Sequence, residues 1–147
     1  MEIINRKARY EYNIIEDLIG GIVLQGSEVK SIREGKCNIS DAYCYIHNGE
    51  IFLKNANISK YHSDTFTNHE ELRDRKILLT KREINKWNKQ LIIPGITIIP
   101  LKIFINNRGL IKIQIGLCKG KKEYDKRESI KENDISREMD LVMKNYG

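Results

Sequence analysis

Residues 101–115 read LKIFINNRGLIKIQI, and this segment sets the fold class. Aliphatic residues occupy every second position over 101–105 and again over 111–115, which is the period of a strand with one buried face. The intervening NNRG at 106–109 is typical of a tight turn. We therefore predict an antiparallel hairpin here and a mainly β protein.

A second hairpin is expected earlier in the chain. Residues 39–48 alternate, HNGE at 47–50 contains the Asn-Gly turn signal, and 51–53 form the return strand. A further strand is expected to begin at Tyr10. The pair Gly20-Gly21 predicts a bend or bulge in it, as in a sheet that curls toward a barrel.

Two helices and one long loop complete the predicted body. SEVKSIRE, residues 27–34, is expected to form a short helix capped by Ser27 that closes one end of a small barrel. TKRE at 80–83 is a capping box, and Ile84, Trp87 and Leu91 follow at helical spacing. Residues 55–75 are polar, and we expect most of them to form a surface loop.

Composition restricts the classes of function. The chain has 147 residues, a length that favours a single domain. Its net charge of +6 and pI near 9.2 favour a polyanionic partner. No apolar run approaches the roughly 20 residues of a membrane span, and no secretory signal is visible. The three cysteines have no C-x-x-C spacing and predict reduced thiols in a cytoplasmic protein.

Basic residues recur in four clusters, which suits a module that grips RNA by its shape and backbone. The clusters are Arg6, Lys7 and Arg9; Lys30, Arg33 and Lys36; Arg73, Arg75, Lys76, Lys81 and Arg82; and a run from Lys119 onward. The last lies in GLCKGKKEYDKRESIK, residues 116–131, with Tyr124 as its only aromatic residue. A charge run that merely keeps the surface soluble is the alternative interpretation.

The boundary of the folded body is predicted near residue 118, which gives a barrel domain over 1–118 and a basic tail over 119–147. In the tail, Ile135, Met139, Val142 and Met143 fall at helical spacing. A lone helix of this length is marginal in water. We therefore expect a tail that is disordered when free and helical when bound.

No pattern indicates catalysis, a metal or a cofactor. His69-Glu70 does not continue to H-E-x-x-H, because position 73 is Arg. His47, His62 and His69 have no spacing that suggests a shared metal, and no glycine-rich phosphate loop is present. The sequence favours a binding protein over an enzyme.

Three ordered stretches resemble the SsrA-binding protein family, also called small protein B, the tmRNA partner in bacterial ribosome rescue. They are NRKARYEY at 5–12, LQGSEVKSIR at 24–33 continuing through GK at 35–36 to NISDAY at 38–43, and KGKK at 119–122 with YDKR at 124–127. RKILL at 75–79 also matches. The resemblance covers nearly the whole chain.

The resemblance implies an OB-fold-like antiparallel barrel without catalytic activity that binds the tRNA-like domain of tmRNA. It implies that Asn5, Leu78 and Lys112 contact this RNA. It further implies that the tail enters the vacant decoding site of the small ribosomal subunit and the mRNA channel as a helix. The tail residues concerned are Lys119, Gly120, Lys121, Lys122, Tyr124, Asp125, Lys126, Arg127 and Lys131.

Two other functions stay open at this point. A general single-strand-binding module would need exposed aromatic rings on one sheet face, for which Tyr43, Tyr45 and Phe104 are candidates. A ribosome-associated structural protein would use the tail only as an electrostatic anchor.

Overall fold

The computed structural model describes residues 1–62 and 68–121. Its strands are β1 (Glu2–Ile4), β2 (Tyr12–Ile22), β3 (Cys37–Asn38), β4 (Tyr43–His47), β5 (Glu50–Lys54), β6 (Asn57–Ile58), β7 (Arg75–Leu78), β8 (Ile96–Ile105) and β9 (Ile111–Gly120). Its helices are α1 (Arg6–Glu11), α2 (Gly26–Arg33) and α3 (Lys81–Gln90).

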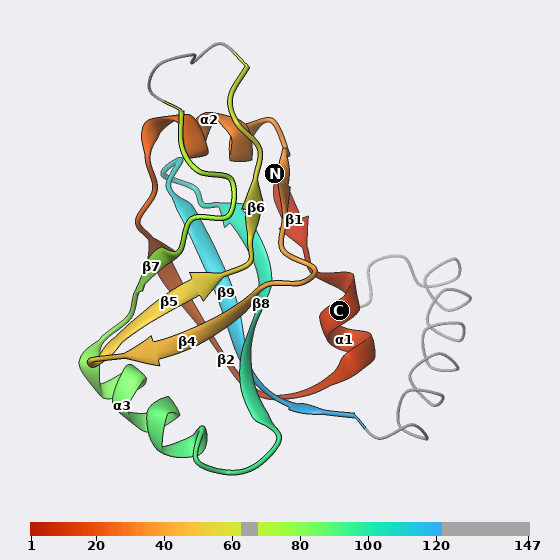
Figure 1. The fold of residues 1–147 in the computed structure, drawn as a ribbon, viewed down its shortest axis with the longest axis vertical. Coiled ribbons are helices and arrows are strands. Elements are labelled where there is room, and N and C mark those ends of the chain that lie inside the picture. The colour runs from red at the N-terminus through yellow and green to blue at the C-terminus, as the bar shows by residue number, and fades with distance from the viewer. Residues whose placement is uncertain (63–67, 122–147) are drawn as a thin grey trace.

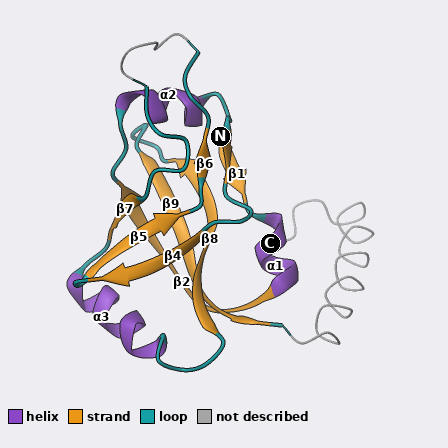
Figure 2. Cartoon of the chain, viewed as in Figure 1, coloured by secondary structure: helices purple, strands orange, loops and turns teal. Residues whose placement is uncertain are grey.

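The main sheet closes on itself. Its seven strands follow the order β1-β8-β4-β5-β7-β2-β9, and β8 also pairs with β9, so that the sheet forms an antiparallel barrel with β1 attached to β8. Helices α2 and α3 lie at opposite ends of the barrel (Figures 1 and 2). The predicted mainly β, barrel-like fold with short helices is confirmed.

The hairpin predicted from residues 101–115 is β8–β9. Ile105 pairs with Ile111, and the side chains of Ile103, Ile113 and Ile115 are buried in the barrel. The turn is held by the Asn106 side chain, whose Oδ1 accepts from two backbone N–H groups. The strands run further than the alternation indicates: β8 begins at residue 96 and β9 ends at residue 120.

The hairpin β4–β5 is also confirmed. Asn48 and Gly49 both have positive φ, at 51° and 75°, as a tight two-residue hairpin turn requires. Strand β4 begins at Tyr43 rather than at the predicted residue 39. Residues 39–42 belong to no strand, and residues 37–38 before them form β3, which pairs with β6 in a separate two-stranded sheet.

The prediction that a strand begins at Tyr10 was wrong. Residues 6–11 form helix α1, because the Asn5 side chain accepts a hydrogen bond from the Ala8 backbone N–H and caps the helix. Ala8 is buried against Ile99 and Cys118 in a small second core on the outside of the barrel. Strand β2 starts only at Tyr12.

The bulge of β2 does not lie at Gly20-Gly21, where a bend or bulge was predicted. Strand β2 is continuous through both glycines, and its register shift lies between Ile14 and Glu16. A Cβ on Gly20 would lie 2.8 Å from the backbone oxygen of Leu78. Glycine is therefore needed for the close approach of β2 to β7.

Of the caps predicted for the two longer helices, the one of α3 is present and the one of α2 is not. The capping box of α3 is present, because Thr80 accepts from the Glu83 N–H and the Glu83 carboxylate accepts from the Thr80 N–H. Ser27 does not cap α2. The helix starts one residue earlier, with Gln25 as its cap, and Ser27 is buried in contact with His69.

The core joins the barrel to both end helices. Ile32 of α2 and Trp87 of α3 belong to the same buried cluster as the inward residues of the strands. Segment 55–75 is only partly a surface loop, because it contains β6 and the buried residues Ala56, Ile58 and His69. No helix in the described ranges is long and apolar enough to cross a membrane.

Candidate nucleic-acid interface

One outward row of residues crosses four neighbouring strands. Leu78 of β7 pairs with Gly21 of β2, Gly21 pairs with Lys112 of β9, and Lys112 pairs with Phe104 of β8. Adjacent residues in these strands, such as Ile77, Ile103 and Ile113, are buried. Because side chains alternate across a strand, the row itself points out of the barrel.

Exposed apolar side chains surround this row. Ile19, Leu78 and Leu110 are 57%, 52% and 52% exposed. We call the surface formed by Ile19, Leu78, Phe104, Leu110 and Lys112 the β2–β9 face. A cluster of exposed aliphatic side chains on a closed barrel is typical of a binding surface, because these side chains add nothing to the stability of the fold while they remain in water.

A hollow of about 360 Å³ opens on the same side of the barrel. Its lining includes Leu78, Leu110 and Lys112 of the β2–β9 face together with Arg33 of α2. The Arg33 guanidinium donates to the Gly109 carbonyl at 3.2 Å and so ties α2 to the turn that carries Leu110. Three residues predicted to bind RNA, namely Arg33, Leu78 and Lys112, thus meet around one hollow.

The two lysines of this region differ in their partners. Lys102 lies 5.0 Å from the centre of the Phe104 ring and pairs with Glu2 at 3.3 Å. Lys112 makes no ion pair or side-chain hydrogen bond with the described residues. Its ammonium group is available to a phosphate without the loss of an internal partner.

Arg75 was predicted to contact RNA, and in this structure its guanidinium is paired inside the protein. Its side chain is fully buried and donates through Nε to the Glu28 carboxylate at 2.6 Å. Its remaining N–H groups donate to the carbonyls of Ala56, Glu70 and Glu71. Inward-pointing residues of β7 alternate with outward ones, so Arg75 holds segment 55–75 in place while Lys76 faces out.

The Glu28 carboxylate is the centre of this buried network. Burial alone would raise its pKa, but hydrogen bonds from Arg73, from the Gln25 backbone and from Arg75 outweigh burial, and the pKa lies below its usual value. Nearby, His69 bridges the Ser27 hydroxyl and the Ile58 carbonyl, each at 2.7 Å. The network connects α2 to the loop that follows β6.

Asn5 is likewise buried, with 2% of its surface exposed. Its amide nitrogen donates to the carbonyls of Ile39 and Pro100, and its oxygen caps α1. These hydrogen bonds hold the start of α1, which carries exposed cations, and the contact of Asn5 with RNA stays a prediction.

The N-terminal cations and the start of the tail come together in space. Arg6, Lys7 and Arg9 are exposed on α1, and the Lys121 ammonium donates to the Arg9 carbonyl at 2.8 Å. Lys119 and Gly120 belong to β9, not to a separate tail, because they pair with the start of β2. The other predicted tail residues, Lys122, Tyr124, Asp125, Lys126, Arg127 and Lys131, lie outside the described residues.

The remaining predicted cations are distributed over other surfaces. Lys30 lies 5.2 Å from the centre of the Tyr61 ring, Lys36 pairs with Glu34, and Lys76 pairs with Glu50. They do not join the hollow. Sequence reasoning missed Leu110, which lies between β8 and β9 and is 52% exposed.

The described residues offer little for metal or thiol chemistry. No group of three His, Cys, Asp or Glu side chains among them could hold a metal ion. Burial raises the pKa of Cys37 to about 11 and that of Cys118 to about 11, so both thiols stay protonated and weakly nucleophilic at neutral pH.

Known proteins resemble this chain over almost its full length. The family model described as SmpB protein matches residues 2–145. An SsrA-binding protein of Flavobacterium johnsoniae is 47% identical over 99% of this chain and 97% of its own length, and one of Enterococcus faecalis is 48% identical over 96% and 91%. A chain of the solved structure described as "tmRNA-SmpB: a journey to the center of the bacterial ribosome" is 36% identical, has a TM-score of 0.70, and aligns over 88% of this chain and 94% of its own. The chain belongs to the SmpB protein family.

Proposed function

We propose that this protein is a non-enzymatic adaptor that binds the tRNA-like domain of tmRNA and delivers it to stalled ribosomes. The β2–β9 face binds the RNA, and the basic tail occupies the vacant decoding site and the mRNA channel. The adaptor acts in the cytoplasm, where the ribosomes are, and needs no cofactor. The names of its relatives and of its structural neighbour support both partners.

The observation that carries the proposal is the arrangement around Gly21. Leu78 and Lys112 come from distant parts of the sequence, yet both pair with this residue and lie on either side of it. Gly21 has no side chain, so the surface between them is open. A folded RNA presents ribose and base faces beside phosphates, and this face presents aliphatic side chains beside an ammonium group.

A binding competition tests this proposal. The full chain is titrated with a tRNA-like fragment of tmRNA in the presence of excess poly(U). We expect the fragment to win, and Leu78→Ala to weaken its binding. Ile92→Ala is the matched control, because Ile92 is 82% exposed on the turn that follows α3 and away from the β2–β9 face. Equal losses in both variants would contradict the proposal.

The same competition decides on a second candidate, a general single-strand binder. Tyr45 and Phe52 stack with ring centroids 5.4 Å apart on neighbouring strands, and such a pair can take a further base. Under that function, poly(U) would displace the fragment, and Tyr45→Leu would weaken binding more than Leu78→Ala does.

A further inference from the structure

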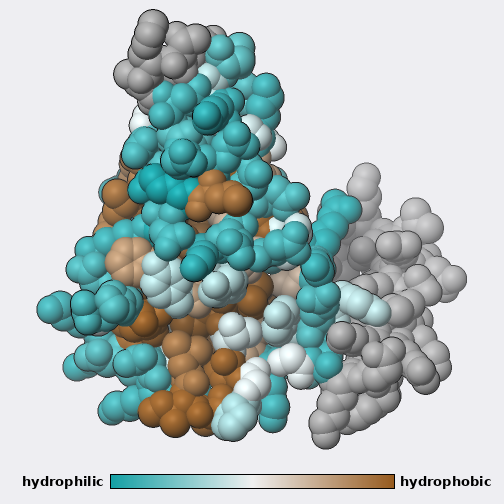
Figure 3. All heavy atoms as spheres, in the orientation of Figure 1, coloured by the Kyte–Doolittle hydropathy of each residue, from teal (hydrophilic) through white to brown (hydrophobic). Residues whose placement is uncertain are grey.

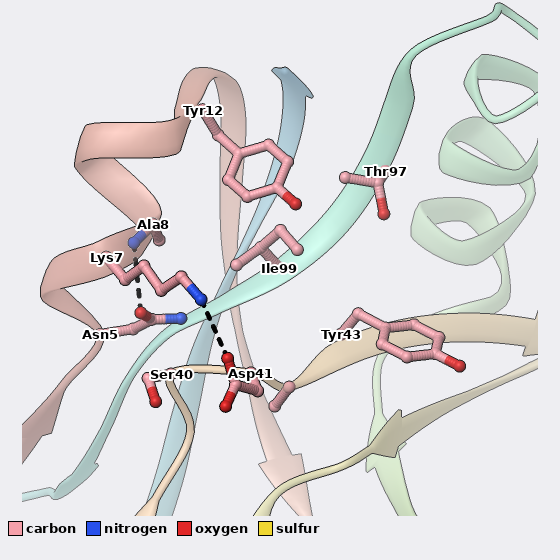
Figure 4. Close-up of a pocket in the computed structure, with 10 residues that line it drawn as sticks. Asn5, Lys7, Ala8, Tyr12, Ser40, Asp41, Tyr43, Thr97 and Ile99 are labelled. Atoms are coloured by element: carbon pink, nitrogen blue, oxygen red, sulfur yellow. Dashed lines mark hydrogen bonds and ion pairs between the residues drawn. The ribbon is translucent and has the colours of Figure 1, made fainter. Parts of the chain in front are cut away.

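A second hollow, of about 250 Å³, lies on the outside of the barrel beside α1. Figure 4 shows Tyr12, Ile99 and Thr97 around it, with Tyr43 on β4 at its edge. It is separate from the β2–β9 face, because it shares no lining residue with the hollow around Leu78 and Lys112. In Figure 3 the upper part of this face is largely hydrophilic, and apolar residues gather in its lower centre.

A donor and an acceptor stand side by side among its lining residues. The Lys7 ammonium donates to Asp41 Oδ1 at 3.0 Å, and both side chains are well exposed, at 48% and 77%. An exposed ion pair of this kind is only weakly stabilising. A ligand can therefore bind the ammonium and the carboxylate together at little cost.

The interior of this hollow has unused polar groups over an apolar base. The hydroxyls of Tyr12, Tyr43 and Thr97 make no hydrogen bond with the described residues, and Ile99 and Ala42 are buried beneath. The volume lies below the roughly 300–1,000 Å³ of sites for drug-sized ligands. One flat heterocycle with polar edges matches this combination of size, apolar floor and hydrogen-bonding groups.

The surroundings are suited to phosphates. Arg6 and Arg9, on the same short helix as Lys7, are exposed and have no side-chain partner in the described part of the chain. Cations beside a base-sized hollow match a nucleotide within a strand, whose phosphates extend on both sides of the base.

We propose that this hollow binds the base of an unpaired guanine in RNA. The Asp41 carboxylate would accept from the N1–H and N2–H groups of guanine, while Lys7 donates to O6. Adenine presents one donor, its N6 amino group, and an unprotonated N1 on this edge, so it can make one hydrogen bond to the carboxylate where guanine makes two, and it should bind more weakly. The proposal goes beyond the binding of a tRNA-like domain by the β2–β9 face and does not depend on it.

The test compares two RNA pentamers, UUGUU and UUAUU, by fluorescence anisotropy with the full chain at fixed salt concentration. We expect UUGUU to bind about five- to hundred-fold more tightly, which is the discrimination of one good two-point contact to a base. Asp41→Asn, which replaces one acceptor oxygen by a donor, should remove this preference. Because Asp41 is exposed, the melting temperature of the Asp41→Asn variant should stay close to that of the wild type.

Two controls separate the outcomes. Glu16→Gln alters a different exposed lysine–carboxylate pair, Lys86 with Glu16 at 3.2 Å, and should leave the preference unchanged. Leu78→Ala should weaken binding of the tRNA-like fragment and not the preference for UUGUU. Failure of UUGUU to bind, equal binding of both pentamers, or a preference that survives Asp41→Asn would each overturn the guanine site without bearing on the β2–β9 face.

Discussion

Nε of Arg75 donates to the Glu28 carboxylate at 2.6 Å, and neither side chain has any exposed surface. The pair joins β7 to α2, and Arg73 donates to the other carboxylate oxygen. Two cations around one buried anion leave neither Glu28 nor Arg75 uncompensated. In strand β7, with sequence RKIL, Arg75 is therefore held inside the protein, while Leu78 is exposed to a binding partner.

Replacing Glu28 by Gln should lower the free energy of unfolding by about 3–5 kcal/mol, because Arg75 would then be a buried charge without its anion. Chemical denaturation measures this change. Glu34→Gln, which alters the exposed pair with Lys36, should have an effect below about 1 kcal/mol. Similar losses in the two variants would show that the buried pair has no special role.

The stability of the protein should also depend on pH, because the pKa of the Glu28 carboxyl is lowered in the folded state. Its pKa is lowered in the folded state, so its stabilising contribution is complete above the unfolded pKa, near 4.5, and is lost as pH falls through the folded pKa. Melting curves between pH 7 and pH 2 should therefore converge for the wild type and Glu28→Gln at the acid end. A constant difference across that range would contradict the lowered pKa.

Asn5→Ala should destabilise the protein without any direct loss of an RNA contact. The change removes the Asn5 amide donor from the Pro100 and Ile39 carbonyls and removes the cap of α1. The Ile39 carbonyl keeps the Ala42 N–H, so the cost of about 1–3 kcal/mol for a buried group left unpaired applies to the Pro100 carbonyl. We expect a lower melting temperature. At a temperature where the variant is folded, its affinity for the tRNA-like fragment should be close to that of the wild type. A large loss of affinity by a fully folded variant would return Asn5 to the RNA interface.

Lys112→Ala and Leu78→Ala should be distinguishable by salt. A lysine that neutralises one phosphate adds about one unit to the slope of log affinity against log salt, so Lys112→Ala should flatten the slope by about one. Leu78→Ala should weaken binding at every salt concentration and leave the slope unchanged. Lys89→Ala, an exposed lysine on α3 with no partner among the described residues, is the control for charge alone.

The position of a truncation should matter near the end of β9. A chain that ends after Lys121 keeps the pairing of Lys119 and Gly120 with β2, and it should fold and bind tmRNA but not support tagging on stalled ribosomes. A chain that ends after Cys118 loses this pairing and the hydrogen bond from the Lys121 N–H to Glu11, so it should melt at a lower temperature. Equal melting temperatures would place the end of the folded body earlier.

Local sequence alone was enough for the elements whose signals are local. The alternation and the NNRG turn predicted β8–β9, Asn48-Gly49 predicted β4–β5, and the capping box predicted α3. In each, the residues that form the structure are close in the chain, so period and turn chemistry determine the outcome. Helix α1 is the exception. The Asn5 side chain that caps it is also close in the chain, but the alternation that begins at Tyr10 predicted a strand there instead.

Tertiary structure alone decided the faces of the barrel. RKIL gives no sign that Arg75 points in and Leu78 points out, because an arginine is buried only where a carboxylate from a distant helix meets it. Gly20 reads as a bend until β7 is placed against it, 2.8 Å from where its Cβ would be. The β2–β9 face depends on pairing between residues far apart in sequence, and a shift of one residue would turn each side chain to the opposite side.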